Sequence, residues 1–423
     1  MCLNVFLLLV GYYILKTVRE PLILLAGGAE LKSWAASAQA LTLIGYVPLY
    51  GWVASRLPRQ RFLTAVILFF VGCIQLFFVG HQLGFPYLGF VFFVWVGIFS
   101  LTTIAQFWSY ANELFTRPEG ERLFPLIAVG STAGAPLGAA LAGYLFASGV
   151  GPFAMMQIAA GILLLHLALY RAQWARTSTR ARPPEEPMGA GNGFGLVLKN
   201  PYLRLAALLL VLLNLVNTVG EFVLGRAVLA DADARFAANP AFNKEAYIGT
   251  FYSTFLFWTS VATIVIQAFF VSRLVRRFGM AGAVLALPLV AFGSYGMAAA
   301  GAGLGALLWL KVAENSADYS VNNTAKQMIW LPTSREEKYK AKQAIDTFFV
   351  RAGDVLALGV VLLGTRQLGL GVAGFARANV VIVLVALGVA LLLLREYGRL
   401  TTRTMGGQPT PNPQEAPGAA ATA

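Results

Sequence analysis

Charged residues are scarce in this sequence of 423 residues. Asp, Glu, Lys and Arg make up 12% of the chain, whereas hydrophobic residues make up 58%. A soluble domain carries roughly 25% charged residues. Apolar residues replace the missing charge, so a soluble protein of this composition would lack the polar side chains to cover its surface. The composition therefore excludes a soluble globular protein and indicates a membrane protein, in which helices satisfy the backbone hydrogen bonds locally.

Cysteine and histidine are also rare, with two residues of each. Cys2 and Cys73 both fall in apolar segments, which excludes a disulfide framework and a paired-cysteine metal site. His81 and His166 are isolated, so a histidine-based metal site is not expected. The sequence contains no GxxxxGK(S/T), HExxH or GxSxG motif. It therefore predicts neither ATP hydrolysis of the P-loop type nor a resident metal or cofactor.

Apolar segments of the length needed to cross a bilayer, about 20 residues, occur along the whole chain. They lie near residues 3–25, 34–55, 61–80, 86–113, 122–147, 151–171, 200–226, 247–271, 279–299, 303–328, 342–365 and 374–395. A polar linker rich in Pro and Gly separates the sixth from the seventh. The sequence thus predicts an all-α polytopic membrane protein of twelve transmembrane helices. We expect an N-terminal bundle at 1–171, a cytoplasmic linker at 172–198, a C-terminal bundle at 199–397 and a disordered cytoplasmic tail at 398–423.

Basic residues gather in alternate connections between the apolar segments. The net charge of +13 would suggest nucleic-acid binding if it lay on one folded face, but it is spread over these connections. The basic connections contain Arg56, Arg59, Arg61, Arg117, Arg122, Arg171, Arg176, Arg180, Arg182, Arg273, Arg276, Arg277, Arg335, Lys338, Lys340, Lys342, Arg395, Arg399 and Arg403. The intervening connections contain few: Lys32, Arg235, Lys244 and Arg366. Because basic loops face the cytoplasm, we expect both termini to be cytoplasmic. We also expect a monomer in the inner membrane that is surrounded by lipid and binds no nucleic acid.

The two halves of the sequence resemble each other in short matching segments. TVRE at 17–20 corresponds to TVGE at 218–221, and SRL at 55–57 corresponds to SRL at 272–274. The matching segments occur in the same order in both halves. Six plus six spans with a long central loop is the layout of major facilitator transporters. We therefore expect a 6+6 pseudo-twofold fold of the major facilitator type.

Polar residues form stripes at helical spacing within five of the apolar segments. The stripes comprise Lys16, Arg19 and Glu20; Thr102, Gln106, Tyr110 and Glu113; Asn214, Asn217 and Glu221; Lys311, Glu314, Asp318, Asn322 and Lys326; and Asp346, Arg351 and Asp354. Buried charge is costly in a membrane and marks a partner, water or a function. In the major facilitator layout four of these segments line the central cavity, so the stripes predict a wet path lined by charge from both halves. Pairing that only holds the helices together is the structural alternative.

Two roles are expected for the charged residues of the stripes. The substrate-binding candidates are Lys16, Arg19, Glu113, Asn217, Glu221, Lys311, Lys326 and Arg351. The gating or coupling candidates are Glu20, Glu314, Asp318 and Asp346. Because 17–20 and 218–221 are matched segments, we expect Arg19 and Glu221 to lie around one central cavity. Small residues at Gly130, Gly134, Gly138 and Ala142 predict close helix packing or a sliding contact along 122–147.

Several motifs resemble the nucleotide transporter family of intracellular bacteria and plastids, the ATP/ADP translocases. LKTVRE at 15–20 is similar to the family's L-R-D-T-K-D, and FWSYANE at 107–113, followed by ERLFPL at 121–126, is similar to F-W-x-F-A-N-E and K-R-F-Y-P-L. KQMIWLP at 326–332 and KQAID at 342–346 are similar to K-E-M-A-Y-I-P and K-A-A-I-D. The resemblance extends over nearly all of the spans.

The resemblance implies exchange of nucleotides, typically ATP against ADP, across a membrane. It implies that the charges important for transport fall on Arg19, Glu113, Glu221 and Lys326. The sequence departs from the family at the expected site, where Arg19 replaces a lysine, Glu20 an aspartate and Gln327 an acidic residue. These departures bear on which substrate is carried.

Two other functions fit the same residues. A proton-coupled major facilitator transporter of another small solute would use Glu113, Glu221 and Asp318 as proton carriers, since burial raises the pKa of a carboxyl group. A membrane enzyme or scaffold would place its polar residues near one water interface. Asp231 and Asp233 resemble the acidic pair of membrane glycosyltransferases, but the stripes run along helices through the membrane.

Overall fold

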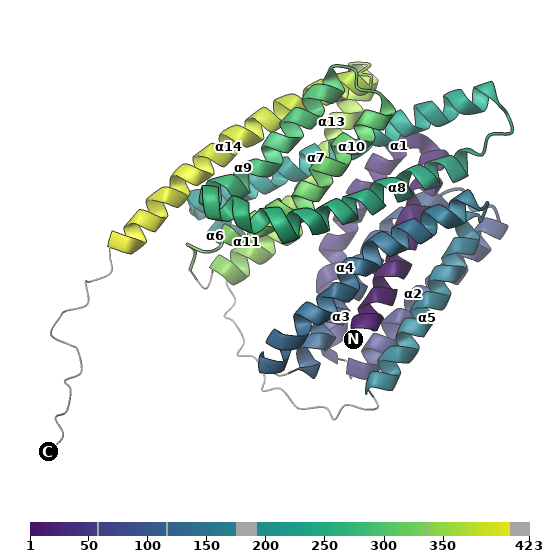
Figure 1. Cartoon of the computed structure of the whole chain (residues 1–423), viewed down its shortest axis with the longest axis horizontal. Coiled ribbons are helices and arrows are strands. Elements are labelled where there is room, and N and C mark those ends of the chain that lie inside the picture. The colour runs from purple at the N-terminus through teal and green to yellow at the C-terminus, as the bar shows by residue number, and fades with distance from the viewer. Residues whose placement is uncertain (57–58, 116, 175–192, 335–336, 407–423) are drawn as a thin grey trace.

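The protein is built from long helices arranged in two groups (Figure 1). We describe a computed structural model, which covers residues 1–56, 59–115, 117–174, 193–334 and 337–406. Within these ranges every regular element is a helix. The first group comprises α1 (Cys2–Arg56), α2 (Arg59–Gln82), α3 (Leu88–Leu114), α4 (Arg117–Ala147) and α5 (Pro152–Trp174).

The second group begins after the linker with the short helix α6 (Gly193–Lys199). Its long helices are α7 (Pro201–Ala238), α8 (Lys244–Val265), α9 (Val271–Ala299), α10 (Leu304–Ala317), α13 (Val350–Leu362) and α14 (Val372–Gly406). Shorter turns join them: α11 (Asn323–Met328), α12 (Lys342–Ala344) and the π-helical η1 (Ile266–Phe270), η2 (Asp318–Asn322), η3 (Glu337–Ala341), η4 (Ile345–Phe349) and η5 (Leu363–Gln367). π-Helical turns inside α-helices are frequent at functional sites, and η2 carries Asp318.

Helix α1 contains two limbs that meet at a glycine pair. Gly27 and Gly28 leave the helical conformation, and Gly28 has φ +68°. Glycine adopts positive φ without the steric cost that a Cβ imposes. The chain therefore reverses within two residues, and the predicted segments 3–25 and 34–55 become two limbs of one continuous element. Gly279, with φ +58°, breaks α9 in a similar way.

Apolar cores lie within each group of helices and also between the two groups. Val5, Phe92 and Met155 belong to a core within the first group, and Leu210 and Ile345 belong to one within the second. A third core is shared between the groups. It contains Ile23, Leu24, Ala29, Ala35, Phe93 and Ala139 of the first group and Val219, Phe222, Val228, Ile248, Tyr252 and Phe255 of the second. The two groups are thus one packed unit on the side where α1 turns.

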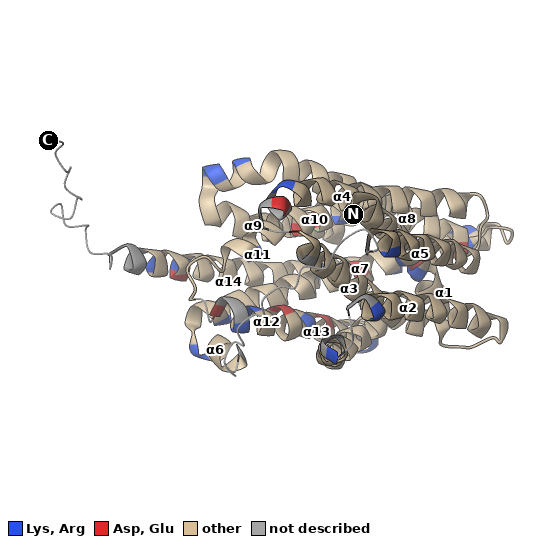
Figure 2. Cartoon of the chain, turned by 90° about the horizontal axis from the view of Figure 1, so that it is seen from below, with Lys and Arg blue, Asp and Glu red and all other residues tan. Residues whose placement is uncertain are grey.

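The outer surfaces of the helices are apolar, as a bilayer requires. Figure 2 shows that most of the helical ribbon seen in that view consists of uncharged residues, with few charged ones. The exposed large hydrophobic residues include Leu68, Phe69 and Leu76 of α2, Leu164 and Leu165 of α5, Leu289 and Phe292 of α9, and Leu384, Val385, Leu391 and Leu392 of α14. In the described ranges, nine helical stretches have the length and composition to cross a membrane. The chain is therefore a multi-pass membrane protein.

The two groups touch at one end and diverge at the other. We call the end that carries Arg56, Arg59, Trp174 and Gly193 the linker side, and the end with the Gly27–Gly28 turn the far side. On the far side Arg366 Nη2 lies 2.7 Å from Glu30 Oε1 across the two groups. Figure 1 shows the groups diverging toward the linker side. The closed end of the protein is therefore the far side.

The ends of the bundles differ slightly from the expected boundaries. Helix α14 continues to Gly406, so residues 398–406, which we assigned to the tail, are helical. Helix α6 lies inside the segment assigned to the linker. Residues 175–192 and 407–423, which make up most of the predicted linker and tail, lie outside the described ranges.

Helix α4 packs closely on the first limb of α1 through a row of glycines. A Cβ added to Gly138 would lie 2.8 Å from the Val10 carbonyl oxygen, and one added to Gly134 would lie 2.7 Å from that of Phe6. Neither position can accept a side chain without moving the backbone of α1. The close packing predicted for 122–147 is confirmed.

Gly138→Ala should destabilise the protein, because the added methyl group has no space against α1. Overpacking of this kind costs about 1–3 kcal/mol. Gly161→Ala on α5 is the matched control, since a Cβ there would meet no atom within 4 Å. Thermal unfolding in detergent should show a lower midpoint for Gly138→Ala only. An equal shift in both variants would contradict the packing role of Gly138.

Candidate functional site

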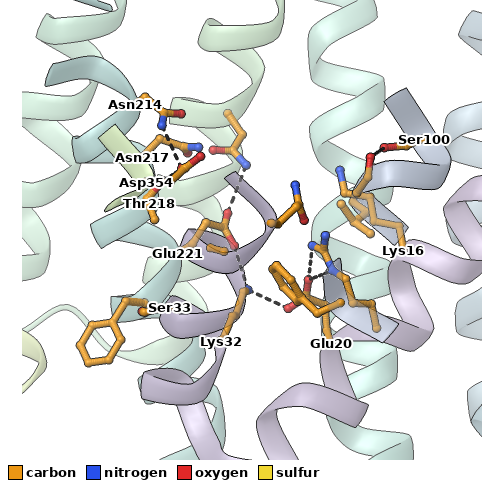
Figure 3. Close-up of a pocket in the computed structure, with 18 of the residues that line it drawn as sticks. Lys16, Glu20, Lys32, Ser33, Ser100, Asn214, Asn217, Thr218, Glu221 and Asp354 are labelled. Carbon is orange, nitrogen blue, oxygen red and sulfur yellow. Dashed lines mark hydrogen bonds and ion pairs between the residues drawn. The ribbon is translucent and has the colours of Figure 1, made fainter. Parts of the chain in front are cut away.

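A polar cavity of about 460 Å³ lies between the two groups of helices. Residues from α1, α3, α7, α8, α10, η2 and α13 line it. The charged lining residues are Lys16, Arg19, Glu20, Lys32, Glu221, Asp318, Arg351 and Asp354. Figure 3 shows side chains from both groups pointing into this space. Charge from both halves therefore surrounds one central site, as the stripes predicted.

Lys32 joins the two halves by an ion-pair bridge. Its Nζ lies 2.7 Å from Glu20 Oε2 and 3.2 Å from Glu221 Oε2 (Figure 3). It also lies 3.5 Å from the Tyr252 hydroxyl of α8. Lys32 and Glu20 are buried, with 5% and 3% of their surface exposed. The bridge thus links carboxylates at matched positions of the repeat, Glu20 in TVRE and Glu221 in TVGE.

The sequence analysis placed Lys32 in an intervening loop and did not select it as a site residue. The structure corrects this, because the chain turns at Gly27 and Gly28 and the second limb of α1 begins at once. Lys32 is therefore one helical turn inside the protein. The glycine pair was the signal in the sequence, since it marks a turn too short to form a solvated loop.

A second buried cluster lies behind the cavity wall formed by α7. Lys311 Nζ is 3.0 Å from Glu314 Oε2 and 2.7 Å from Asn217 Oδ1. The Tyr295 hydroxyl donates to Glu314 at 2.5 Å. Gly220 makes room for this cluster, because a Cβ there would collide with the Tyr295 hydroxyl. This explains why the repeat has glycine where TVRE has Arg19.

Glu221 connects this cluster to the bridge. Its Oε1 lies 3.9 Å from Lys311 Nζ, while its Oε2 faces Lys32. Glu221 is thus placed between one lysine from each half. A buried carboxylate requires such partners, because charge is poorly solvated in the interior.

Asp354 forms a third charged cluster on the cavity wall. Its carboxylate accepts hydrogen bonds from Asn214 at 2.9 Å and Thr218 at 2.8 Å, and Arg351 lies 3.5 Å away. The Ser37 hydroxyl of α1 donates to the Asp354 carbonyl at 3.0 Å. This last bond is a further polar link between the halves, besides those made by Lys32 and by Arg366.

Two cations on the first limb of α1 face the cavity. Arg19 Nη2 lies 2.5 Å from Glu20 Oε1, and its guanidinium lies 4.2 Å from the Phe93 ring centroid. Lys16 lies over the rings of Tyr12, Tyr13 and Tyr319, at 6.0, 5.4 and 6.0 Å. Arg19 and Glu221 line one cavity, as predicted, and they are linked through Glu20 and Lys32.

The cavity collects most of the predicted site residues. Those that line it are Lys16, Arg19, Glu20, Asn217, Glu221, Asp318 and Arg351. Lys311 and Glu314 lie directly behind it. Lys326 lies 3.4 Å from Asp318 but is not among the lining residues, and Asp346 is exposed on η4. The side chain of Glu113 lies outside the described part of the structure.

The described part of the polar stripe on 86–113, which is Thr102, Gln106 and Tyr110, does not line the cavity, contrary to our expectation. Thr102 is hydrogen-bonded to Tyr46 at 2.8 Å, and Gln106 borders a small internal space beside His166 and Tyr170. Another face of α3 reaches the cavity, with Phe93, Gly97 and Ser100. Both residues thus face the interior of the first half, where Thr102 has a hydrogen-bond partner and the Gln106 Nε2 has none among the described residues. Periodicity indicated a polar face but not which neighbour it would meet.

Solved structures with similar architecture are transporters. A mutant form of the nucleoside transporter NupG superposes with a TM-score of 0.68 at 13% identity, covering 93% of this chain and 99% of that one. A bacterial homologue of the iron transporter ferroportin, in an inward-facing state, gives 0.66 at 13% identity over 93% and 97%. The peptide transporter PepTSo gives 0.65 at 12% over 94% and 97%. The chain therefore has the fold of these transporters, which is of the major facilitator type.

Relatives of this chain in sequence are named for the nucleotides ADP and ATP. ADP,ATP carrier protein 1 of Chlamydia muridarum is 25% identical over 84% of this chain and 79% of the carrier. The protein of the same name from Chlamydia trachomatis serovar D is 24% identical over the same shares. No protein-family profile matches the chain. The chain is a distant homologue of the chlamydial ADP,ATP carriers.

Lys32→Gln should destabilise the transporter more than Glu221→Gln. The first change leaves Glu20 and Glu221 without the cation between them, whereas the second leaves Lys32 paired with Glu20. Breaking a buried ion pair costs about 3–5 kcal/mol. Arg366→Gln is the control, because its exposed pair with Glu30 should contribute at most about 1 kcal/mol. Thermal unfolding in detergent measures the midpoints of the three variants. A fall in the midpoint for Glu221→Gln that equals or exceeds the fall for Lys32→Gln would contradict the bridge.

Proposed function

We propose that this protein is an antiporter that exchanges nucleotides, of the ATP and ADP type, by alternating access. The observation that carries the proposal is the central cavity, whose charged residues come from both halves of a major facilitator fold. The distant homology to ADP,ATP carriers supports the nucleotide as substrate. Arg19, Lys32 and Arg351 provide cations that suit phosphate groups, Arg as a planar fork and Lys as a point charge.

We propose twelve membrane crossings in a 6+6 arrangement. Nine stretches meet the length and hydropathy criteria within the described ranges. Two of them, Cys2–Val53 and Lys244–Ala299, are long enough for two crossings each and contain the glycine breaks at Gly28 and Gly279. The helix from Leu304 to Met328 supplies the twelfth, its hydropathy lowered by Lys311, Glu314 and Asp318. A charged helix is tolerated in a membrane where it faces protein or water.

The charge of the loops gives the orientation in this proposal. Basic residues gather on the linker side, so that side faces the cytoplasm and both termini are cytoplasmic. Because the halves meet on the far side and diverge toward the linker side, the described conformation is open to the cytoplasm (Figure 1). The membrane is then the cell membrane.

Opening the far side requires the halves to separate there. The Lys32–Glu221 and Arg366–Glu30 pairs must then break. Lys32 keeps Glu20, which is on its own half, and Glu221 keeps Lys311 within 3.9 Å on its own half. Neither charge is left alone in the low-dielectric interior, so the two states can have similar free energies. Rocking of packed halves between two such arrangements is a common transport motion.

Purified protein in liposomes loaded with ADP should take up labelled ATP. Uptake should depend on internal nucleotide, since in an exchange one nucleotide leaves the liposome for each one that enters. The proton-coupled alternative is tested by applying a pH gradient to liposomes without internal nucleotide. Under that alternative, the gradient by itself would drive uptake. Uptake of no nucleotide by protein that is folded and correctly inserted would refute the nucleotide proposal.

Cross-linking the far side should stop transport. In a variant with Cys2 and Cys73 replaced by Ser, Glu30→Cys with Arg366→Cys places one thiol on each half of the closed end. A short, reducible bifunctional thiol reagent should then hold that end closed, and exchange should cease until the reagent is cleaved. Asp231→Cys with Arg235→Cys is the control, because both positions lie on one turn of α7. Unchanged exchange in the cross-linked Glu30–Arg366 variant would contradict opening at the far side.

A further inference from the structure

Most cations near the cavity already have a carboxylate partner. Arg19 pairs with Glu20, Lys32 with Glu20 and Glu221, and Arg351 with Asp354. Behind and beside the cavity, Lys311 pairs with Glu314 and Lys326 with Asp318. A phosphate group that binds one of these cations competes with a carboxylate already in place.

Lys16 differs from these cations. It lines the cavity, yet no ion pair joins it to an acidic side chain in the described part of the chain. Instead its ammonium lies 5.4–6.0 Å from the centroids of three tyrosine rings. A cation over an aromatic ring gains about 0.5–2 kcal/mol, which is less than the penalty for holding an isolated charge away from bulk water. Lys16 is therefore a positive charge in the cavity that has no acidic side chain within ion-pairing distance among the described residues.

The tyrosines around Lys16 come from both halves. Tyr12 and Tyr13 precede it on α1, whereas Tyr319 lies on the π-helical turn η2 of the second half. Tyr12 and Tyr319 also line the cavity. An anion bound at Lys16 thus lies beside residues from both halves, and it can affect how the halves move.

We infer that Lys16 is the residue that makes the carrier select for a phosphorylated substrate. This inference rests on the nucleotide exchange proposed above. The phosphate supplies a negative charge in direct contact with Lys16, which no carboxylate supplies among the residues that the structure describes. A neutral nucleoside leaves the charge uncompensated, so it binds without this contribution. Arg19, the other cation on this face of α1, is less suited to this role because its guanidinium already pairs with Glu20 and lies over the Phe93 ring.

The test compares Lys16→Gln, Lys16→Arg and the control Lys244→Gln. Lys244 is removed from the cavity and pairs with Asp233 at 2.6 Å. Adenosine, AMP, ADP and ATP compete with labelled ATP for exchange in liposomes. Lys16→Gln should weaken competition by the phosphorylated compounds roughly 10- to 100-fold, the range for a hydrogen bond to a charged group. Adenosine should compete as it does with the wild-type protein, and Lys16→Arg and Lys244→Gln should preserve the wild-type order.

The stability of the same variants provides an independent measurement. Lys16→Gln removes a charge that has no carboxylate partner, so its thermal unfolding midpoint without ligand should equal or exceed that of the wild-type protein. Lys32→Gln, which removes a paired charge, should lower it. A large fall for Lys16→Gln would show that Lys16 is neutralised within the protein, which would overturn the inference.

The outcomes separate this inference from the proposed function. If the wild-type protein exchanges nucleotides and Lys16→Gln retains the full preference for phosphorylated compounds, the inference fails and the exchange stands. If the wild-type protein exchanges no nucleotide, the exchange fails, and thermal stabilisation by inorganic phosphate and pyrophosphate decides the inference. Stabilisation that Lys16→Gln abolishes supports an anion site at Lys16. Stabilisation that is absent, or unchanged in Lys16→Gln, overturns it.

Discussion

A charge inside a membrane protein must find an opposite charge, and the arrangement of the two halves follows from this requirement. Glu20 and Glu221 come from matched positions in the repeat, and both are held by Lys32. Two carboxylates facing each other across the cavity would repel, so the lysine between them allows the halves to meet there. The shared apolar core around Leu24, Val219 and Tyr252 packs beside the same bridge. Polar and apolar contacts thus close the same end of the protein.

The structure combines contacts that are fixed with contacts that are exchangeable. Within the first half, glycines of α4 let two backbones approach until no side chain fits between them. Such packing has one good arrangement and keeps each half rigid. Between the halves, ion pairs such as Glu221 with Lys32 have a second partner nearby, in this case Lys311. A transporter that rocks rigid halves needs this difference, because motion must be confined to the interface.

Lys16 is the exception to the pairing of charges in the cavity. Tyrosine rings surround it where other cations have carboxylates. A cavity with one positive charge that has no ion-pair partner among the described residues favours a negatively charged ligand by electrostatics. The distant ADP,ATP carrier relatives are named for substrates with several negative charges.

The sequence by itself determined that the chain is helical and lies in a membrane, which segments are apolar, and that charged residues line a path between two halves. These properties depend on local composition and periodicity, which can be read from the sequence without knowing which residues are in contact. Only the tertiary structure decided which charges meet. Lys32 and Glu221 are 189 residues apart, and a glycine turn moved Lys32 from an expected loop into the interior. The stripe at Thr102 and Gln106 was visible in the sequence, but it faces its own half and not the cavity. A helix has faces that its sequence defines, whereas the rotation of each face toward a neighbour is set by the packing of the whole molecule.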